Sequence, residues 1–503
     1  MKMDKIKLLY VENIITRKTS LVQQQLTFFI LVENVSYSKQ VDVIWAGEDD
    51  IWHTLPVNFH GMQGLDKEHW HATINFDLTP KQSLAGNIKF SLRYRVSGKE
   101  YWDNNHGLNY AAEADSGIQL THNQQIQNVG FDNHLEDKPQ SIALTIAVAN
   151  AFNAKTVTIH WTTNRWETTH KTKCCLNHNY WDTNFQSNAR NPNQYETQLW
   201  TAELKGEDWF KSEYIIKCEN SAQTLWENNA EHNYRFQHER LKILILNLHC
   251  YQEENQDDKF TQIAKTIDKL EIDIVCLQEV AEYWRDGEGD WESNSAKIIN
   301  DRLNKPFYLH NDWSHLGFDK YREGVAILSR YPLSNKESSY VSESHDIYSI
   351  HSRKVVAAEV YVPFIGKINV FSAHLSWLED GFKAQFEQLQ QWADKNNRDE
   401  IKATLLCGDF NVAAGSSGYQ LIVDSGDYED QFLAINKQGV FEKVFKVNDD
   451  HWRELLADDY RIDYIFMKKG SELQITSAKV IFTDQDYGPV SDHCGYFMTF
   501  EPR

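Results

Sequence analysis

The stretch Thr404–Val412 reads T-L-L-C-G-D-F-N-V, and it decides how the second half of this chain is interpreted. Its apolar run, Thr404–Cys407, predicts a buried strand, and Gly408 predicts a turn that ends the strand. Asp409 and Asn411 follow at a spacing of two, so a carboxylate and a carboxamide would face the same way off the end of a sheet. A carboxylate can accept a proton or hold a metal, and a carboxamide can donate to an anionic oxygen. An isolated G-D-x-N is more often a turn, so the other polar residues of this half must decide.

Other apolar runs in the C-terminal half also end in polar residues. The amphipathic patterns at 258–270 and 381–396 predict helices, and they alternate with predicted buried strands at 241–246, 272–277, 324–329, 368–373, 462–467 and 495–500. Ionisable groups are costly at buried strands unless they are paired or hold a metal. One polar residue at the end of a predicted strand is more often structural, but eight together predict a functional site. They are Asn247, Glu279, His374, Asp409, Asn411, Asp463, Asp492 and His493.

The order of these pieces resembles the endonuclease/exonuclease/phosphatase superfamily. The motifs that carry the resemblance are L-N-L-H at 246–249, L-Q-E-V at 277–280, Y-R-E-G at 321–324, S-A-H-L at 372–375, G-D-F-N at 408–411, R-I-D-Y-I at 461–465 and S-D-H-C-G at 491–495. The resemblance implies a metal-dependent phosphoesterase domain over residues 240–503, built as an α/β four-layer sandwich. His374, where the apurinic-endonuclease branch has a tyrosine, favours the branch of pancreatic-type deoxyribonucleases and bacterial sphingomyelinases. The W-x-x-W-C-D-R pattern of inositol-polyphosphate 5-phosphatases is absent.

The resemblance and the chemistry of the side chains together imply a metal site and a hydrolytic centre. Glu279, Asp492 and Asn247 are expected to hold Mg²⁺ or Mn²⁺, because these ions prefer oxygen ligands. Asp409 is expected to orient or deprotonate the attacking water, and Asn411 to donate to a phosphoryl oxygen, as is Asn247.

The histidines are expected to lie beside the scissile phosphate. His493 would contact the phosphate, with Asp463 fixing its tautomer. His374, paired with Glu323, would protonate or stabilise the leaving oxygen. Arg353 is either a phosphate contact or a surface arginine.

The first half contains one pattern written twice. Residues 101–110 read Y-W-D-N-N-H-G-L-N-Y and residues 225–234 read L-W-E-N-N-A-E-H-N-Y, which share W-[DE]-N-N-x-x-x-N-Y. Short strand patterns with turn signals between them predict an all-β, immunoglobulin-like sandwich over 1–115 and another over 140–237. Residues 116–139 are rich in polar residues and are expected to form a linker, with room for a short strand.

Each copy resembles a family 21 carbohydrate-binding module, the starch- and glycogen-binding β-sandwich also found in glycogen-targeting subunits of protein phosphatase 1. The resemblance implies sugar contacts in the first copy at Trp52, Tyr101, Trp102, Asn104, Asn105, Asn109 and Tyr110. In the second copy it implies contacts at Trp166, Trp226, Asn228, Asn229, Asn233 and Tyr234. Aromatic faces can cover sugar rings, and Asn amides can bond to hydroxyls. The alternative is that the aromatic residues belong to the hydrophobic core and the Asn residues stabilise turns.

Composition limits the partners. The 503 residues carry a net charge of −21, which argues against broad binding of polyanions because that binding depends on Lys and Arg. Neither a signal peptide nor an apolar stretch of membrane-spanning length is visible, so a cytoplasmic location is expected, and a signal-independent export route would leave no trace. The seven cysteines include no C-x-x-C pair, which favours reduced core cysteines.

Several substrates remain open. In the favoured interpretation, a phosphate ester is hydrolysed on a phosphorylated carbohydrate or close to glycogen or starch. In the main alternative, the catalytic half is a nuclease that the β modules position, although the charge balance does not favour nucleic acid. A lipid phosphoesterase acting on sphingomyelin or phosphoinositides is a further alternative, and an inactive scaffold is the least favoured, because the polar strand ends are all present.

Overall fold

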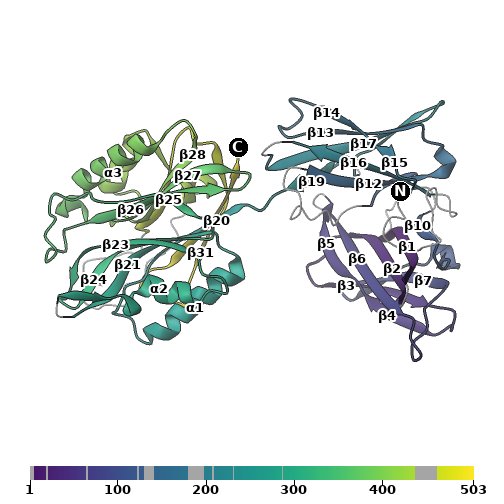
Figure 1. Cartoon of the computed structure of the whole chain (residues 1–503), viewed down its shortest axis with the longest axis horizontal. Coiled ribbons are helices and arrows are strands. Elements are labelled where there is room, and N and C mark those ends of the chain that lie inside the picture. The colour runs from purple at the N-terminus through teal and green to yellow at the C-terminus, as the bar shows by residue number, and fades with distance from the viewer. Residues whose placement is uncertain are drawn as a thin grey trace. The chain divides into compact units, whose positions relative to one another are not determined.

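The structure is a computed structural model that describes residues 5–18, 21–63, 66–121, 124–129, 141–178, 197–206, 209–229, 231–285, 287–436 and 461–503. The chain divides into two compact units, Met1–Gln237 and His238–Arg503 (Figure 1). The first unit holds two β-sandwiches, and the second unit is a mixed α/β domain.

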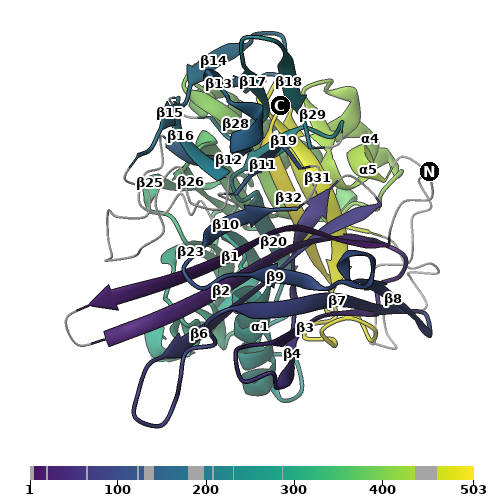
Figure 2. The ribbon, with the colours of Figure 1, turned by 90° about the vertical axis from the view of Figure 1, so that its right-hand side faces the viewer.

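The first sandwich is built from two antiparallel sheets. One sheet has the order β10-β1-β2-β6-β5, and the other has the order β4-β3-β7-β8 with β9 beside β7. The strands β1 and β2 pair along almost their whole length and form a long ribbon (Figure 2). Phe28 of β2 packs edge to face against Phe90 of β7 in the core between the two sheets. The strand bounds are β1 (Ile6–Lys18), β2 (Leu21–Glu33), β3 (Lys39–Ala46), β4 (Trp52–Pro56), β5 (Asn58–Gln63), β6 (Lys67–Asp77), β7 (Ile88–Val96), β8 (Lys99–Asp103), β9 (Tyr110–Ala112) and β10 (Gly117–Leu120).

The second sandwich repeats this plan. Its sheets have the orders β11-β12-β16-β15 and β14-β13-β17-β18, with β19 beside β17. The strand bounds are β11 (Ile126–Asn128), β12 (Ser141–Ala149), β13 (Thr156–Thr162), β14 (His170–Lys173), β15 (Cys175–Leu176), β16 (Thr197–Lys205), β17 (Lys211–Glu219), β18 (Thr224–Glu227) and β19 (Tyr234–Gln237). A small apolar cluster joins the outer faces of the two sandwiches, where Tyr10 and Phe29 of the first meet Ala147 and Leu199 of the second.

The segment expected as a linker, 116–139, contains two paired strands. β10 pairs with β1 of the first sandwich, and β11 pairs with β12 of the second. Ordered structure from both sandwiches therefore extends into this segment, because its short apolar stretches complete sheet edges. Residues 122–123 and 130–140 lie outside the described residues.

The α/β domain consists of two mixed sheets. A seven-stranded sheet has the order β23-β24-β21-β20-β32-β31 with β22 beside β21, and a six-stranded sheet has the order β25-β26-β27-β28-β30-β29. The bounds of the first are β20 (Leu241–Asn247), β21 (Ile274–Arg285), β22 (Glu288–Asp290), β23 (Tyr308–Gly317), β24 (Tyr321–Ser329), β31 (Leu473–Ile481) and β32 (Gly495–Pro502). Those of the second are β25 (Leu333–Tyr340), β26 (Lys354–Val362), β27 (Gly366–His374), β28 (Ile401–Asp409), β29 (Tyr428–Asp430) and β30 (Asp463–Lys468).

Helices cover the outer face of each sheet, which gives four layers (Figure 1). The helices are α1 (Gln256–Leu270), α2 (Ser295–Asp301), α3 (Phe382–Asn396), α4 (Ser417–Asp424) and α5 (Gln431–Ile435). α1 packs Phe260 and Ile263 onto the first sheet, and α3 packs Phe386 and Leu389 onto the second. The inner faces of the sheets meet at a hydrogen bond of 3.1 Å from Gln278 Nε2 to Ser372 Oγ.

The expected turn at Gly408 is wrong, because β28 continues through Gly408 to Asp409. Gly408 has a φ of +131°, and a Cβ at this position would lie 2.1 Å from the carbonyl oxygen of Ala373 on the neighbouring strand. Glycine is therefore required for close approach of two strands rather than for a turn. The consequence is that Asp409 lies at the very end of a rigid strand.

Candidate active site

The polar strand ends of the α/β domain converge on one cavity of about 960 Å³. Each sheet contains one parallel strand pair, β20–β21 in the first and β27–β28 in the second, so the carboxyl ends of each pair lie at one edge. Of the nine residues expected in the catalytic and metal sites, seven line the cavity: Glu279, Glu323, His374, Asp409, Asn411, Asp492 and His493. The other two, Asn247 and Asp463, hydrogen-bond to these residues.

A β-bulge presents Glu279 to the cavity. The pairing of β21 with β24 shifts register between Gln278 and Val280, and Glu279 has a φ of +49°. Such a bulge turns a side chain out of the regular alternation of a strand. The bulge explains how a carboxylate in the middle of a long β-strand faces the cavity.

Asn247 links two of the carboxylates. Its Nδ2 donates hydrogen bonds of 2.9 Å to Glu279 and 3.1 Å to Asp409, and its Oδ1 accepts from the backbone N–H of His249. The amide N–H groups of Asn247 fix the positions of Glu279 and Asp409. Its Oδ1 has a second lone pair, so the role of Asn247 as a metal ligand stays a prediction.

His493 is held as a cation between two carboxylates. Its Nδ1 lies 2.8 Å from Asp463 and its Nε2 lies 3.7 Å from Asp409. Burial opposes the charged form, but the charge and hydrogen bond of Asp463 outweigh it and hold the pKa of His493 well above its usual range. Burial, together with the charge of Asp463, raises the pKa of Asp409 to about 7.

His374 has a different partner from the one expected. An N–H of Arg353 donates to His374 Nδ1 at 3.3 Å, and His374 Nε2 lies 3.7 Å from Asp409. Burial and the charge of Arg353 hold the pKa of His374 well below its usual range, so the imidazole is neutral and carries its proton on Nε2. His374 is therefore a hydrogen-bond donor, and the expected role as an acid that gives up a proton does not fit.

Glu323 pairs with His315, which the sequence did not single out. Glu323 Oε1 lies 3.5 Å from His315 Nε2, so the expected pairing of Glu323 with His374 is wrong. Burial and the nearby charge of Glu279 raise the pKa of Glu323 to about 8. The pairing could not be read from the sequence, because His315 lies on β23 and no motif marks it.

Asn411 is anchored to the backbone. Its Nδ2 donates to the carbonyl oxygen of Leu375 at 2.8 Å, and its main-chain N–H donates to Asp409 at 2.8 Å. One of its two amide protons is therefore engaged inside the protein, which leaves the other for an oxygen in the cavity. Asn411 thus also holds Asp409 in position.

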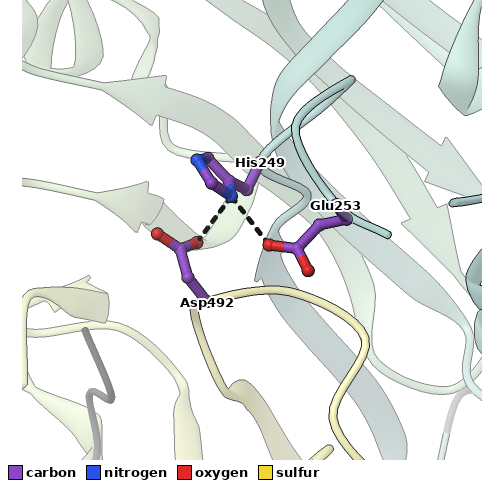
Figure 3. Close-up of side chains that lie close together, drawn as sticks. All are labelled: His249, Glu253 and Asp492. Carbon is purple, nitrogen blue, oxygen red and sulfur yellow. Dashed lines mark hydrogen bonds and ion pairs between the residues drawn. The ribbon is translucent and has the colours of Figure 1, made fainter. Parts of the chain in front are cut away.

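A second cluster on the cavity wall was missed by the sequence analysis. His249 lies between Glu253 and Asp492, with Nδ1 at 2.7 Å from Glu253 and 3.6 Å from Asp492 (Figure 3). Burial opposes the charge of His249, but the hydrogen bond to Glu253 and the charges of Asp492 and Glu279 raise its pKa to about 9. The sequence signal was H-x-x-x-E after the L-N-L-H motif, which is too common to be decisive alone.

Glu279 and Asp492 fit a hard divalent cation. Burial and the charge of Asp492 raise the pKa of Glu279, and both carboxylates line the cavity. Among the described residues, no Lys or Arg forms an ion pair with Glu279. A cation held by these two carboxylates would relieve the repulsion.

The tryptophans near the cavity differ in their surroundings. Trp284 and Trp313 stack on Arg322, at 4.6 and 4.8 Å from its guanidinium carbon, so they pack on the protein itself. Trp377 lines the cavity, and so do the exposed side chains of Phe318 and Ile350. The mouth of the cavity is therefore partly apolar.

In the sandwiches, the repeated motif builds the same turn twice. Asn105 Nδ2 donates to the carbonyl oxygen of Asn109 at 3.1 Å, and Asn229 Nδ2 donates to that of Asn233 at 3.1 Å. Asn104 accepts from the N–H of Gly107 in the first copy. The equivalent Asn228 accepts from the N–H of Glu231 in the second copy. These side chains stabilise turns, which differs from the expectation that they contact sugar.

The aromatic residues of the motif divide into buried and exposed ones. Tyr110 donates its hydroxyl to Asp103 at 2.8 Å, and the buried Tyr234 donates to Glu227 at 3.4 Å. The structure thus uses these two tyrosines internally, against the expected sugar contact. Tyr101 lies beside the buried Tyr94.

Among the remaining expected sugar contacts, two residues are hydrogen-bonded within the protein and three are exposed. Asn233 and Trp166 both donate to Glu213. Three tryptophans stay about half exposed: Trp52, Trp102 and Trp226.

Family comparisons agree with this arrangement. The model of the endonuclease/exonuclease/phosphatase family matches residues 245–493. The model of the carbohydrate/starch-binding module (family 21) matches residues 5–113 and 123–237. No described helix is long and apolar enough to cross a membrane.

Individual relatives match only segments of the chain. Glucoamylase 1 of Rhizopus oryzae is 36% identical over 86 residues, which are 16% of this chain and 13% of that protein. Protein phosphatase 1 regulatory subunit 3E of Mus musculus is 35% identical over 80 residues, which are 16% of this chain and 28% of that protein. This chain therefore spans well under two thirds of the length of these curated relatives. Among solved structures, an endonuclease/exonuclease/phosphatase family protein from Leptotrichia buccalis is 27% identical with a TM-score of 0.45, and the match covers 52% of this chain and 99% of that one.

Proposed function

Because residues 245–493 form an endonuclease/exonuclease/phosphatase family domain and residues 5–113 and 123–237 form carbohydrate-binding modules of family 21, we propose that this phosphoesterase hydrolyses a phosphate ester of an α-glucan, with a divalent metal ion. The observation that carries the hydrolytic part is the double hydrogen bond of Asn247 to Glu279 and Asp409. This bond fixes the expected metal ligand and the expected base at neighbouring positions in one cavity.

Glu279 and Asp492 are the residues that would hold Mg²⁺ or Mn²⁺. A bound ion supplies positive charge for a phosphoryl oxygen as negative charge accumulates there. Asn247 keeps Glu279 in place through its Nδ2, and the bulge at Glu279 fixes the direction of the carboxylate. Both contacts come from the protein itself, which lowers the cost of organising the site for substrate.

Asp409 is the proposed general base for the attacking water. Its pKa of about 7, raised by burial and the charge of Asp463, is matched to proton transfer near neutral pH. His493 carries a positive charge next to Asp409 and would donate a hydrogen bond from Nε2 to a phosphoryl oxygen. Asp463 keeps His493 in the doubly protonated form.

Arg353 and His374 form the proposed leaving-group side of the cavity. Arg353 donates to Ser376 and to His374 Nδ1, which leaves further guanidinium N–H groups for an anionic oxygen. His374 would stabilise the leaving oxygen through its Nε2–H without giving up the proton, because the imidazole is neutral.

Three features support a carbohydrate over a polynucleotide as substrate. The cavity mouth carries the exposed side chains of Phe318 and Ile350 and the ring of Trp377, which can cover the apolar faces of sugar rings. The cavity lining contains Lys259 and Arg353 as its Lys and Arg residues, among six carboxylates, so it has no basic track for a phosphodiester backbone. Covalent fusion to two starch-binding-family modules raises the local concentration of glucan around the cavity.

A substrate panel tests the proposal. Purified protein with Mg²⁺ or Mn²⁺, and the same protein with EDTA, is incubated with phosphorylated starch, glucose phosphates, plasmid DNA, RNA, sphingomyelin and phosphoinositides. The expected result is metal-dependent phosphate release from the phosphorylated carbohydrates, which Asp409→Asn abolishes. Nicking of DNA without release from carbohydrates would refute the substrate, and hydrolysis that EDTA leaves unchanged would refute the metal requirement.

A further inference from the structure

Three potential ligand atoms lie close together on the cavity wall. Nδ1 of His249, a carboxylate oxygen of Glu253 and a carboxylate oxygen of Asp492 all lie within 4.8 Å of one another. Figure 3 shows the imidazole edge facing both carboxylates. The three residues come from two loops that are distant in sequence, one between β20 and α1 and one between β31 and β32.

This cluster is accessible and shares one residue with the site at Glu279. His249, Glu253 and Asp492 are half-buried and line the cavity, so small ions can reach them from solvent. Asp492 alone is common to the cluster and to the expected metal ligands. A carboxylate has two oxygens with several lone pairs, so one Asp can serve two neighbouring cations.

The meeting point of these ligand atoms requires a positive charge. Two carboxylates face one ring nitrogen, so either a proton on Nδ1 or a metal ion must lie between them. Lys259 forms its ion pair with the other oxygen of Glu253, Oε2, and leaves Oε1 directed at the ring. Lys259 therefore does not occupy the space between His249 and the two carboxylate oxygens.

We infer that His249, Glu253 and Asp492 form a second divalent-metal site, with Asp492 shared with the ion expected at Glu279. One imidazole nitrogen and two carboxylates suit Mn²⁺ or Zn²⁺ better than Mg²⁺, because nitrogen ligands favour transition metals and Mg²⁺ prefers oxygen. An ion here would add positive charge to a cavity that is lined by six acidic residues: Glu253, Glu254, Glu279, Glu323, Asp409 and Asp492. The added charge would favour binding of an anionic phosphate.

Metal stoichiometry tests the inference without any substrate. Equilibrium dialysis of the full chain with Mn²⁺ is expected to give two bound ions per wild-type chain. The pair of changes His249→Ala and Glu253→Gln is expected to leave one ion, and Glu279→Gln is also expected to leave one. Glu254→Gln is the matched control, because Glu254 lines the same cavity, is exposed and lies outside the cluster, so two ions should remain.

A spectroscopic measurement identifies the ligand directly. Electron paramagnetic resonance of bound Mn²⁺ is expected to show coupling to an imidazole nitrogen in the wild type, and loss of this coupling in His249→Ala alone. A single bound ion in the wild type, or an unchanged stoichiometry and nitrogen coupling in the variants, would mean that only a proton occupies the cluster and would overturn the inference. Loss of binding in Glu279→Gln alone would leave the ion at Glu279 as the single metal of the proposed function.

Discussion

Asp463 Oδ2 lies 2.8 Å from Nδ1 of His493, although the two residues are 30 positions apart in sequence. One residue begins β30 of the six-stranded sheet, and the other precedes β32 of the seven-stranded sheet. The hydrogen bond therefore joins the two sheets beside the cavity, which His493 lines. It also explains why His493 is positively charged although it is buried.

Loss of the base or of its cationic neighbour should stop hydrolysis. Asp409→Asn removes the proton acceptor, and His493→Gln removes the charge beside the phosphate, so each is expected to lower kcat by at least about 100-fold. Initial rates on the best substrate of the panel measure the effect. The exposed Asp399→Asn is the control and should retain the wild-type rate. A rate close to wild type in either active-site variant would contradict the assigned roles.

Removal of one metal-binding carboxylate should change the response to metal rather than the fold. Glu279→Gln is expected to raise the Mg²⁺ concentration needed for half-maximal activity by at least about tenfold, because a neutral amide binds hard cations poorly. A metal titration of the rate measures this shift. Glu288→Gln, an exposed change on β22, should leave the titration unchanged. An identical titration for Glu279→Gln would rule this carboxylate out as a ligand.

The metal-free domain should become less stable as the pH rises. Burial and the charge of Glu279 raise the pKa of Glu323 from 4.5 to about 8, so the native state holds a proton that the unfolded chain releases. The free energy of unfolding should therefore fall between these two pH values, with a slope of about 1.4 kcal/mol per pH unit for one such group. His249 acts in the same direction, because its stabilising contribution is present below pH 6.5 and is lost as the pH passes about 9.

Urea unfolding of the full chain in EDTA, between pH 5 and 8, measures this slope. The transition of the α/β domain is identified as the one that moves when metal is added. Glu323→Gln removes the titrating group and is expected to give a shallower slope than the wild type. A slope that Glu323→Gln leaves unchanged would show that this carboxyl group does not titrate as stated.

Gly408 should tolerate no side chain. Gly408→Ala places a Cβ 2.1 Å from the carbonyl oxygen of Ala373 at a φ of +131°, so we expect a loss of about 3 kcal/mol or more in the free energy of unfolding. Gly415→Ala is the matched comparison, since Gly415 also has a positive φ but has open space around it, and about 1 kcal/mol is expected there. Equal losses for the two variants would show that strand contact at Gly408 is not the limiting factor.

The exposed tryptophans of the sandwiches should carry glucan binding. Trp102→Ala and Trp226→Ala are each expected to weaken retention on glycogen by about tenfold without a change in thermal stability, because both rings are about half exposed. Tyr110→Phe should behave in the opposite way. It removes the hydrogen bond to Asp103, so stability should fall by about 1 kcal/mol while glycogen retention persists. Affinity electrophoresis in glycogen gels separates these outcomes, and retention of Trp102→Ala like the wild type would refute the contact.

Local patterns were sufficient to place most of the site. Asp409 and His493 could be predicted because buried strands have a recognisable apolar pattern and a polar residue at the end of such a strand is costly unless it is used. The doubled W-[DE]-N-N-x-x-x-N-Y pattern likewise identified two sandwiches. Strand order, and the meeting of strand ends at one edge, follows from parallel pairing within each sheet.

The ion-pair and hydrogen-bond partners of the site residues could not be predicted from the sequence. Whether Glu323 pairs with His315 or with His374, and whether His249 faces Glu253, depends on how strands and loops far apart in the chain lie across the cavity. The hydrogen bond of Tyr110 to Asp103 could not be predicted either, because a sequence motif does not show whether an aromatic side chain is buried or exposed.

The sequence by itself thus determined the domain types and the residues that gather at the strand ends, since both follow from periodicities along the chain. Only the tertiary structure decided which of those residues are charged and which of their atoms carry a proton. Burial and the distance to neighbouring charges set those properties, and neither quantity is defined until the two sheets have packed together.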